Sequence, residues 1–226
     1  MLAPGVIGTS KSCSFRLAAD EIHIWNADQL PVRGLAEFLS ADEVERASRI
    51  AMAEPRQSFL GARACLRYLL GRYTESDPLR LRFSYGPHGK PSLPGSGLEF
   101  SLTRSAGPVR IAVAAGRPLG IDVERIRPIG QMAQIARRFF TPGEAAALED
   151  VPAEHRLEAF FRCWARKEAY LKATGAGLTG LASGPCGTGW DFVDLAAPCG
   201  YVAALAYACG AGPIGCEMAQ AFRSFG

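Results

Sequence analysis

This chain lacks the cysteine and histidine patterns that are typical of metal-binding and redox proteins. Its seven cysteines include no C-x-x-C pair, and its three histidines do not fall at metal-ligand spacing from them. An odd number of unpaired cysteines is typical of reduced thiols in a cytosolic protein. There is no P-loop, H-E-x-x-H or G-x-S-x-G motif, and the G-x-G-x-x-G match at 175–180 follows a predicted helix instead of a strand. The common nucleotide, zinc-protease and serine-hydrolase patterns are therefore excluded.

Long apolar runs and a strong net charge are also missing. No run approaches the ~20 residues of a membrane span, and residues 1–15 lack the apolar core of a signal peptide. The formal net charge of +3 is too small to argue for a nucleic-acid partner. Apolar residues make up 48% of the chain and charged residues 21%, as in ordinary globular proteins. We expect a cytoplasmic protein with no membrane segment and no nucleic-acid partner.

The order of predicted helices and strands favours the α+β class. Capping boxes at 40–43 and 141–144 mark two helix starts, Pro55 suits the first turn of another helix, and a long helix ends at Gly175. Strands are predicted at 79–85, 97–104, 109–115, 120–126, 190–196 and 201–209. Helices then strands occur twice, and RIAVAAGRP in the first half resembles AALAYACGAGP in the second. This weak echo hints at two similar halves.

Two carboxylates lie side by side in the segment PLGIDVERIRP at residues 118–128. Asp122 and Glu124 are two residues apart in a predicted strand, so their side chains point to the same face. Like charges held this close repel each other and are stabilised by a nearby cation. The segment therefore predicts either an open, solvated face or a bound positive charge.

A third carboxylate interrupts the apolar face of the last predicted helix. Large apolar side chains recur at helical spacing at Leu157, Phe160, Phe161, Trp164 and Leu171. The missing member of this stripe is Glu168, and a carboxylate on a core-facing position needs a partner. Lys172, one turn later, is one candidate, and a purely structural Glu168–Lys172 pair is the simplest interpretation. Taken with Asp122 and Glu124, Glu168 instead completes a set of oxygen ligands suited to Mg²⁺.

Basic side chains gather upstream of these carboxylates. Arg63 and Arg67 lie at i, i+4 on a predicted helix, where like charges are unfavourable unless an anion bridges them. A solvated arginine face is the alternative interpretation. The loop GPHGKP presents Lys90, and the run SLTRS at 101–105 presents Arg104 between hydroxyl side chains. This pattern predicts a phosphate-rich small molecule as the ligand.

Three segments together resemble the 4′-phosphopantetheinyl transferases, namely PLGIDVERIRP, RRFFTPGEAAAL and FFRCWARKEAYLKATGAGL. With the GPHGKPSL loop the likeness covers roughly residues 86–178, and the helix RQSFLGARACLRYLLGRY extends it toward the N-terminus. Its most specific part is the W-x-x-K-E-A-x-x-K block that follows G-I-D-x-E. The match is to the longer single-chain type that activates peptide and polyketide synthases.

The resemblance implies a fold and a reaction. The fold would be a pseudo-dimer of two similar α+β halves, here residues 1–116 and 117–226, with coenzyme A and Mg²⁺ in the cleft between them. The enzyme would move the phosphopantetheine arm of coenzyme A onto a serine of an apo acyl or peptidyl carrier protein and release 3′,5′-ADP. A duplicated chain can build such a cleft alone, so we expect a monomer.

The resemblance also assigns roles to individual residues. The metal-binding acids of the family correspond to Asp122, Glu124 and Glu168. The lysine one turn after the glutamate corresponds to Lys172, which would bind phosphate and assist catalysis. Lys90 corresponds to the loop lysine that touches coenzyme A, and Arg63 to the arginine that reaches its 3′-phosphate.

One departure from the family pattern concerns the run SLTRS. The family usually has Asn-hydrophobic-Ser-His-Ser/Thr there, so its phosphate-contacting histidine is Arg104 in this chain and the preceding serine is Thr103. By this correspondence both Thr103 and Arg104 are expected to bind coenzyme A. Arginine supplies a permanent charge and a planar donor fork, so phosphate binding can survive the exchange. A role that needs a titrating imidazole cannot survive it.

The residues and the resemblance predict the same mechanism. Glu168, or a water that it orients, would take the proton of the carrier serine as it attacks the β-phosphate. Lys172, Lys90 and Arg104 would stabilise the charge on the phosphates. Two alternatives stay open: a coenzyme A-binding relative without catalytic activity and, less favoured, a metal-dependent phosphodiesterase.

Overall fold

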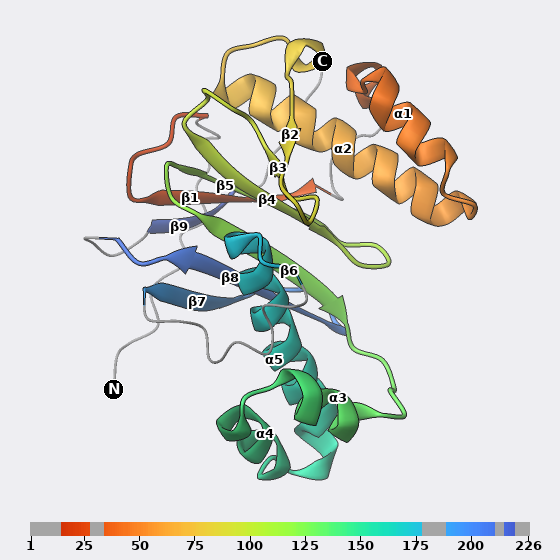
Figure 1. The fold of residues 1–226 in the computed structure, drawn as a ribbon, viewed down its shortest axis with the longest axis vertical. Helices are drawn as coiled ribbons and strands as arrows, with labels where there is room; N and C mark the ends of the chain where they lie inside the picture. The colour runs from red at the N-terminus through yellow and green to blue at the C-terminus, as the bar shows by residue number, and fades with distance from the viewer. Residues whose placement is uncertain (1–14, 28–33, 178–188, 211–214, 220–226) are drawn as a thin grey trace.

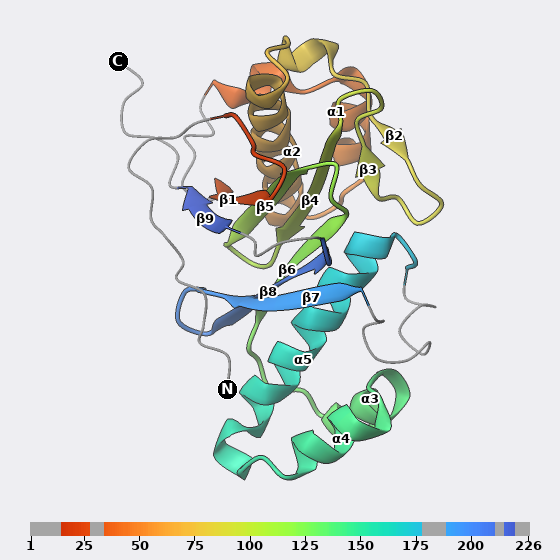
Figure 2. The same cartoon turned by 90° about the vertical axis from the view of Figure 1, so that its left-hand side faces the viewer.

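The computed structural model describes residues 15–27, 34–177, 189–210 and 215–219. Two sheets lie face to face, and each is covered on its outer side by one long helix (Figures 1 and 2). The α+β class expected from the sequence is confirmed. Within the described residues, no helix combines the length and the apolar composition needed to cross a membrane.

The first sheet has the strand order β4-β5-β1-β9. Its strands are β4 (Leu98–Arg104), β5 (Val109–Ala115), β1 (Glu21–Asn26) and β9 (Gly215–Ala219). Strand β1 pairs antiparallel with β5 and parallel with β9. The last strand of the chain therefore belongs to the sheet that contains the first one.

The second sheet is antiparallel, with the order β6-β8-β7. Its strands are β6 (Leu119–Arg125), β8 (Tyr201–Ala208) and β7 (Trp190–Leu195). The two sequence segments that echo each other fall on β5 and β8, and each of these is an inner strand of its sheet.

Helices pack on the outer faces of both sheets. Between β1 and β4 of the first sheet come the 3₁₀ turn η2 (Leu35–Phe38) and the helices α1 (Ala41–Ser48) and α2 (Ala53–Tyr73). A second 3₁₀ turn, η3 (Pro78–Arg80), leads to the short hairpin of β2 (Ser84–Tyr85) and β3 (Pro91–Ser92). The second sheet carries α3 (Met132–Phe139), α4 (Pro142–Glu149) and α5 (Ala153–Thr174).

Three apolar clusters hold these layers together. One joins α2 to the first sheet, with Leu66, Leu69 and Phe100 fully or almost fully buried. A second joins α5 to β8 together with α3 and α4. The third fills the space between the sheets, where Ile22 and Ile24 meet residues of the second sheet such as Ile121. Because β5 is covered on both faces, its sequence is apolar almost throughout.

The helix ends follow their predicted signals. Both capping boxes form, at Ser40 with Glu43 and at Thr141 with Glu144. Helix α5 ends at Gly175, which adopts the left-handed conformation that favours glycine (φ 71°). A buried ion pair of 2.8 Å between Lys167 Nζ and Glu144 Oε2 then holds the start of α4 against α5.

Two strand predictions need correction. The strand expected at 79–85 is wrong over most of its length, because Asp77 and Pro78 begin a 3₁₀ turn and only residues 84–85 pair. Its alternation reflects Leu81 and Phe83, which contact the α2 cluster without a partner strand. Strand β1 was not predicted, although polar and apolar residues alternate from Glu21 to Ile24; both of its faces are buried, and the polar His23 is buried with them.

Helix α5 lies unusually close to β6 at Gly120. A Cβ atom at this glycine would lie 2.0 Å from the carbonyl oxygen of Ala169 and 2.4 Å from the nitrogen of Ala173. Both obstacles are backbone atoms, which cannot move aside as a flexible side chain can. The glycine therefore permits the close contact that brings α5 over the face of β6 carrying Asp122 and Glu124.

We predict that Gly120→Ala lowers the free energy of unfolding by at least about 3 kcal/mol, because overpacking against rigid backbone is at the upper end of such costs. The matched control is Gly143→Ala in α4, where an added Cβ meets nothing within 4 Å. This control should be neutral or slightly stabilising, since alanine is the better helix former. Chemical denaturation of both variants tests the prediction, and equal stabilities would contradict it.

Candidate active site

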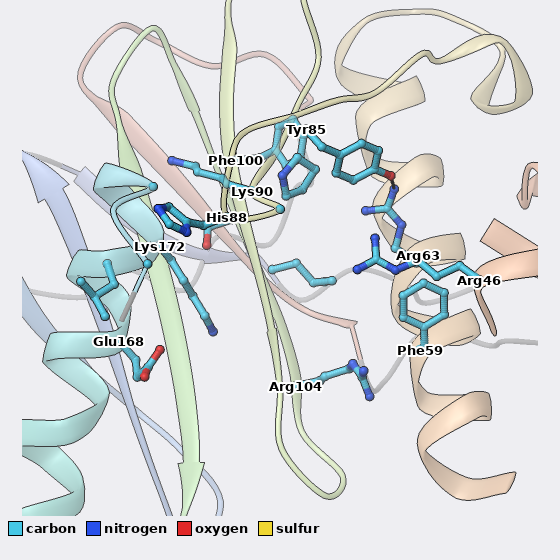
Figure 3. A pocket seen from close by; sticks show the side chains of 17 residues that line it. Arg46, Phe59, Arg63, Tyr85, His88, Lys90, Phe100, Arg104, Glu168 and Lys172 are labelled. Atoms are coloured by element: carbon cyan, nitrogen blue, oxygen red, sulfur yellow. Dashed lines mark hydrogen bonds between the residues drawn. The ribbon is translucent and has the colours of Figure 1, made fainter. Parts of the chain in front are cut away.

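A cavity of about 380 Å³ lies between helices α1 and α2 on one side and the C-terminal half of α5 on the other. In Figure 3, Glu168 and Lys172 of α5 lie on one side of it, and Arg46, Arg63 and Phe59 lie on the opposite side. The loop of the β2–β3 hairpin contributes His88 and Lys90 to its wall. Most of the charged side chains around the cavity are basic, which suits a polyanionic ligand.

A second, open groove of about 630 Å³ adjoins the first cavity. It is lined by the carboxylates Asp122, Glu124 and Glu168 and by the aromatic side chains Phe139 and Trp164. The two hollows share Arg104, Glu168 and Lys172. A basic cavity and an acidic groove therefore meet at the middle of α5.

Asp122 is the most deeply buried of the three carboxylates, with 4% of its surface exposed. Its Oδ1 accepts hydrogen bonds from Lys172 Nζ at 2.6 Å and from Thr103 Oγ1 at 2.9 Å. Its Oδ2 is buried and has no hydrogen-bond partner among the described residues. An unsatisfied buried carboxylate oxygen is costly, so this atom is suited to accept a ligand.

The other two carboxylates are half-buried and crowded by like charge. Burial raises the pKa of Glu124 to about 7, and the neighbouring Asp122 carboxylate adds to the increase. Burial and, after it, Asp122 also raise the pKa of Glu168. Burial and the nearby Asp122 charge both disfavour ionisation of these carboxyls, so a cation bound at this place would stabilise their ionised forms.

The expected pair of Glu168 with Lys172 does not form. Lys172 turns instead to Asp122 on β6 and to Thr103 on β4. Within the described part of the chain, the Glu168 carboxylate makes no hydrogen bond or ion pair and faces both hollows. The close contact at Gly120 explains the difference. It brings β6 so near to α5 that Lys172 reaches Asp122 on that strand instead of Glu168 on its own helix.

The acidic residues fit a divalent cation that keeps much of its own water. Among the described residues, no three His, Cys, Asp or Glu side chains are arranged closely enough to hold a metal ion by themselves. Mg²⁺ is usually bound by one or two carboxylates together with water and substrate phosphate, so it does not need such a complete set. The free Oδ2 of Asp122 and the crowded Glu124 and Glu168 match that mode of binding.

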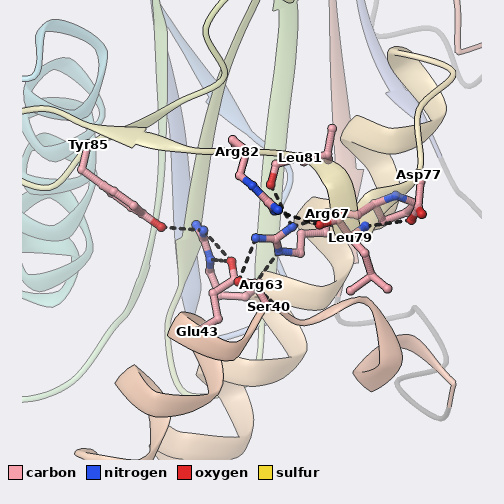
Figure 4. A network of polar contacts seen from close by, with 10 residues as sticks. Ser40, Glu43, Arg63, Arg67, Asp77, Leu79, Leu81, Arg82 and Tyr85 are labelled. Atoms are coloured by element: carbon pink, nitrogen blue, oxygen red, sulfur yellow. Dashed lines mark hydrogen bonds and ion pairs between the residues drawn. The ribbon is translucent and has the colours of Figure 1, made fainter.

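The anion that bridges Arg63 and Arg67 is a side chain of the protein itself. Figure 4 shows Glu43 of α1, 2% exposed, between the two guanidinium groups. Arg63 Nε donates to its Oε1 at 2.7 Å, and Arg67 Nε donates to its Oε2 at 2.5 Å. Arg67 also donates to Ser40 and to backbone carbonyls, so its role is structural.

Arg63 differs from Arg67 because it also reaches the cavity wall. Its Nη2 donates to the hydroxyl of Tyr85 at 2.9 Å, and its guanidinium lies over the ring of Phe83. These contacts fix the orientation of the guanidinium while one edge remains at the cavity. Arg63 is therefore held in place before any ligand arrives.

Lys90 and Arg104 also line the cavity, in different ways. Lys90 Nζ donates to the carbonyl of Ala173 at 2.7 Å, so this ammonium caps the C-terminal turn of α5. Burial lowers the pKa of Lys90. Arg104 is exposed, and its hydrogen bond to the carbonyl of Pro55 is long, at 3.4 Å. It is the more available of the two for a phosphate.

The sequence did not reveal Arg46 and Phe59 as cavity residues. The guanidinium carbons of Arg46 and Arg104 each lie 5.8 Å from the centre of the Phe59 ring. Three basic side chains, from α1, α2 and β4, thus gather at one end of the cavity. The sequence does show that Arg46 lies one turn after Glu43 on α1. Spacing within one helix does not show, however, which other element the Arg46 side chain faces.

Comparison with known proteins places these features in one family. Residues 118–201 match the family model of the 4′-phosphopantetheinyl transferase superfamily. The chain is 39% identical over 179 residues to 4′-phosphopantetheinyl transferase HetI of Nostoc sp., covering 76% of each chain. It is 34% identical to the slr0495 protein of Synechocystis sp., over 73% of this chain and 68% of that one. It is 29% identical to 4′-phosphopantetheinyl transferase Sfp of Bacillus subtilis, over 63% of this chain and 62% of that one.

The pKa of Glu124 predicts a pH-dependent stability. The native carboxyl keeps its proton up to about pH 7, whereas the ordinary value is 4.5, so the free energy of unfolding falls as the pH rises through this interval. In EDTA, we expect Glu124→Gln to be more stable than the wild type at pH 8 by roughly 2–3 kcal/mol. At pH 4.5 the two proteins should be similar, because both side chains are then neutral.

Chemical denaturation at the two pH values checks this expectation. Glu149→Gln is the matched control, because Glu149 is an exposed glutamate at the end of α4. Its effect should be small at both pH values. A Glu124→Gln effect of equal size at pH 4.5 and pH 8 would contradict the assigned electrostatic origin.

Proposed function

Because this chain belongs to the 4′-phosphopantetheinyl transferase family, we propose that it transfers the 4′-phosphopantetheine arm of coenzyme A to a serine of an apo acyl or peptidyl carrier protein. The observation that carries this proposal is the meeting of a basic cavity with a carboxylate groove at Glu168 and Lys172. The cavity suits the nucleotide phosphates of coenzyme A. The open groove gives a second macromolecule access to the same point.

The basic residues divide the work of binding coenzyme A. Arg63 is oriented by Glu43 and Tyr85 and suits the 3′-phosphate, with Arg46 beside it as a further donor. Arg104 lines both this cavity and the carboxylate groove, so it can reach the pyrophosphate. Lys90 and Lys172 add positive charge on the α5 side.

The carboxylates Asp122, Glu124 and Glu168 would hold Mg²⁺ together with water and the pyrophosphate, and the ion would neutralise charge on the departing phosphate. The crowding of these side chains and the unpartnered Oδ2 of Asp122 support this assignment.

In the proposed reaction, the phosphopantetheinyl group passes from coenzyme A to the carrier serine, and that serine loses one proton. The carrier serine oxygen forms a bond to the β-phosphorus, and the bond from that phosphorus to the bridging oxygen breaks, which releases 3′,5′-ADP. Glu168, or a water that it orients, takes the serine proton, and its raised pKa improves it as a base. Lys172 stays beside Asp122 and stabilises negative charge in the transition state.

We further propose the longer single-chain architecture, in which residues 1–116 and 117–226 form two related halves and the protein acts as a monomer. Two observations support this architecture. Each sheet is covered by one long helix, α2 on the first sheet and α5 on the second, and the echoing segments lie on the inner strands β5 and β8. Strand β9 pairs with β1, so the second segment adds one strand to the sheet of the first.

Intact-mass spectrometry of an apo carrier protein tests the proposed reaction. Incubation with this protein, coenzyme A and Mg²⁺ should add the mass of one phosphopantetheine arm. Glu168→Gln should reduce the rate by about 10²–10⁴-fold, since it removes the base and one oxygen ligand. An EDTA sample should show no transfer.

The alternatives make different predictions in the same experiment. Coenzyme A binding without any mass gain, on several acyl and peptidyl carriers, would indicate a non-catalytic relative. Release of 3′,5′-ADP from coenzyme A without a carrier would indicate a phosphodiesterase. Either result would contradict the transferase proposal.

Arg104→Ala tests the assignment of the basic cavity. We expect the KM for coenzyme A to rise about tenfold, because loss of a hydrogen bond to a charged group costs about 1.5–3 kcal/mol. Arg49→Ala is the matched control, since Arg49 is an exposed arginine paired to Glu45 outside this cavity. Steady-state kinetics with varied coenzyme A distinguishes them, and equal KM values for both variants would remove Arg104 from the phosphate site.

A further inference from the structure

Strands β4 and β6 are joined by side-chain hydroxyl groups. The Oγ of Ser101 accepts from the backbone N–H of Ile121 at 3.2 Å. The Oγ1 of Thr103 accepts from Val123 N–H at 3.2 Å, and the Oγ of Ser105 accepts from Arg125 N–H at 3.3 Å. We call these three bonds the hydroxyl ladder.

The hydroxyl ladder takes the place of an ordinary β-ladder. Strands β4 and β6 belong to different sheets, so their backbones do not pair, although each ladder bond joins residues 20 positions apart. The hydroxyls of Ser101 and Thr103 in β4, and of Ser105 directly after it, follow every second residue and point to one face. Each meets an N–H that β6 would otherwise leave unpaired on this side. The run SLTRS thus has a structural requirement for its three hydroxyls.

The middle hydroxyl makes more contacts than its neighbours. Besides accepting from Val123, Thr103 Oγ1 lies 3.1 Å from Lys172 Nζ and 2.9 Å from Asp122 Oδ1. The ammonium can only donate and the carboxylate can only accept. A hydroxyl has one proton and two lone pairs, so Thr103 uses its full capacity within the protein.

We propose that Thr103 is a positioning residue for Asp122 and Lys172 and does not bind the phosphates of coenzyme A. Thr103 is 4% exposed and lines the carboxylate groove but not the basic cavity, and its hydrogen-bonding capacity is already used within the protein. Thr103 and Lys172 together occupy Oδ1 of Asp122. This arrangement directs the unpartnered Oδ2 of the same carboxylate away from them as the free ligand atom.

The backbone bond is what gives Thr103 this control. Because its hydroxyl is held by Val123 N–H, the neighbour of Asp122 along β6, the position of the hydroxyl is tied to the same strand that carries the carboxylate. A β-branched side chain adds restriction at χ1. The Asp122 carboxylate is therefore fixed by a contact from the other sheet and not only by its own strand.

Three variants test the proposal, which rests on the proposed transferase function. Thr103→Val keeps the shape and removes the hydroxyl, Thr103→Ser keeps the hydroxyl, and Ser101→Ala removes one ladder bond that touches no carboxylate. Their kcat, KM for coenzyme A, coenzyme A affinity by calorimetry and unfolding midpoint are compared. Misplacement of a catalytic group by about 1 Å can cost 10²-fold in rate.

The proposal predicts that Thr103→Val loses at least about tenfold more kcat than Ser101→Ala, with little change in coenzyme A affinity. Thr103→Ser should restore most of the rate. A Thr103→Val variant that instead loses coenzyme A affinity, with kcat preserved, would show a phosphate ligand and overturn the proposal. Equal losses of stability and rate in Thr103→Val and Ser101→Ala would reduce Thr103 to a structural member of the ladder.

A crystal structure of Thr103→Val separates this proposal from the transferase function itself. A rotated Asp122 carboxylate, or a separated Asp122–Lys172 pair, is expected whether or not the protein transfers phosphopantetheine. An Asp122 carboxylate that stays in place without the hydroxyl would overturn the positioning role. If the wild type itself shows no transfer to any carrier, the proposed function fails, and this structural result still decides the role of Thr103.

Discussion

The site depends first on the close packing of α5 against β6 at Gly120, where a single added carbon would meet the helix backbone. This contact sets the distance between two charged surfaces, the carboxylates of β6 and the Glu168–Lys172 face of α5. Lys172 can then reach Asp122 on the facing strand instead of Glu168 on its own helix. Glu168 is left without a protein partner in the described structure, which leaves its carboxylate available for chemistry.

The charged groups of the site are stabilised in two different ways. On the side of the first sheet, Glu43 pairs with the buried guanidinium groups of Arg63 and Arg67, so both are held in place before a ligand binds and one positive charge of this set remains uncompensated. On the side of the second sheet, three carboxylates lie near Lys172 and Arg127, and burial together with like charge raises the pKa values of Glu124 and Glu168. Breaking a buried pair is strongly unfavourable, whereas an unsatisfied acidic cluster gains from a cation. The arginine side of the site is held in place by its own ion pairs, whereas the carboxylate side would be stabilised by a bound cation.

The sequence predicted faces and helix ends well because these depend on neighbours along the chain. The strand β5, the two capping boxes and the stop at Gly175 follow from periodicity and local hydrogen bonding. The partners across the fold did not follow. Nothing in the spacing shows that Lys172 meets a residue 50 positions away, or that Thr103 contacts a strand in another sheet. Strand β1 was also missed although its residues alternate from Glu21 to Ile24, and its place between β5 and β9 depends on strands far away in the sequence.

Glu43 has a consequence for how this family of sites can change over evolutionary time. Its carboxylate joins Arg67, which supports the fold, to Arg63, which faces the cavity. Loss of the glutamate leaves two buried guanidinium groups without their carboxylate, at a cost of about 3–5 kcal/mol, and loss of either arginine removes a charge-assisted hydrogen bond to that carboxylate. Single substitutions in this set are therefore blocked on grounds of folding, even where ligand binding would tolerate them. Arg104 is exposed and lies outside this set, so it can be replaced without the same cost in folding, and ligand preference can change there. Glu43, Arg63 and Arg67 can change only together.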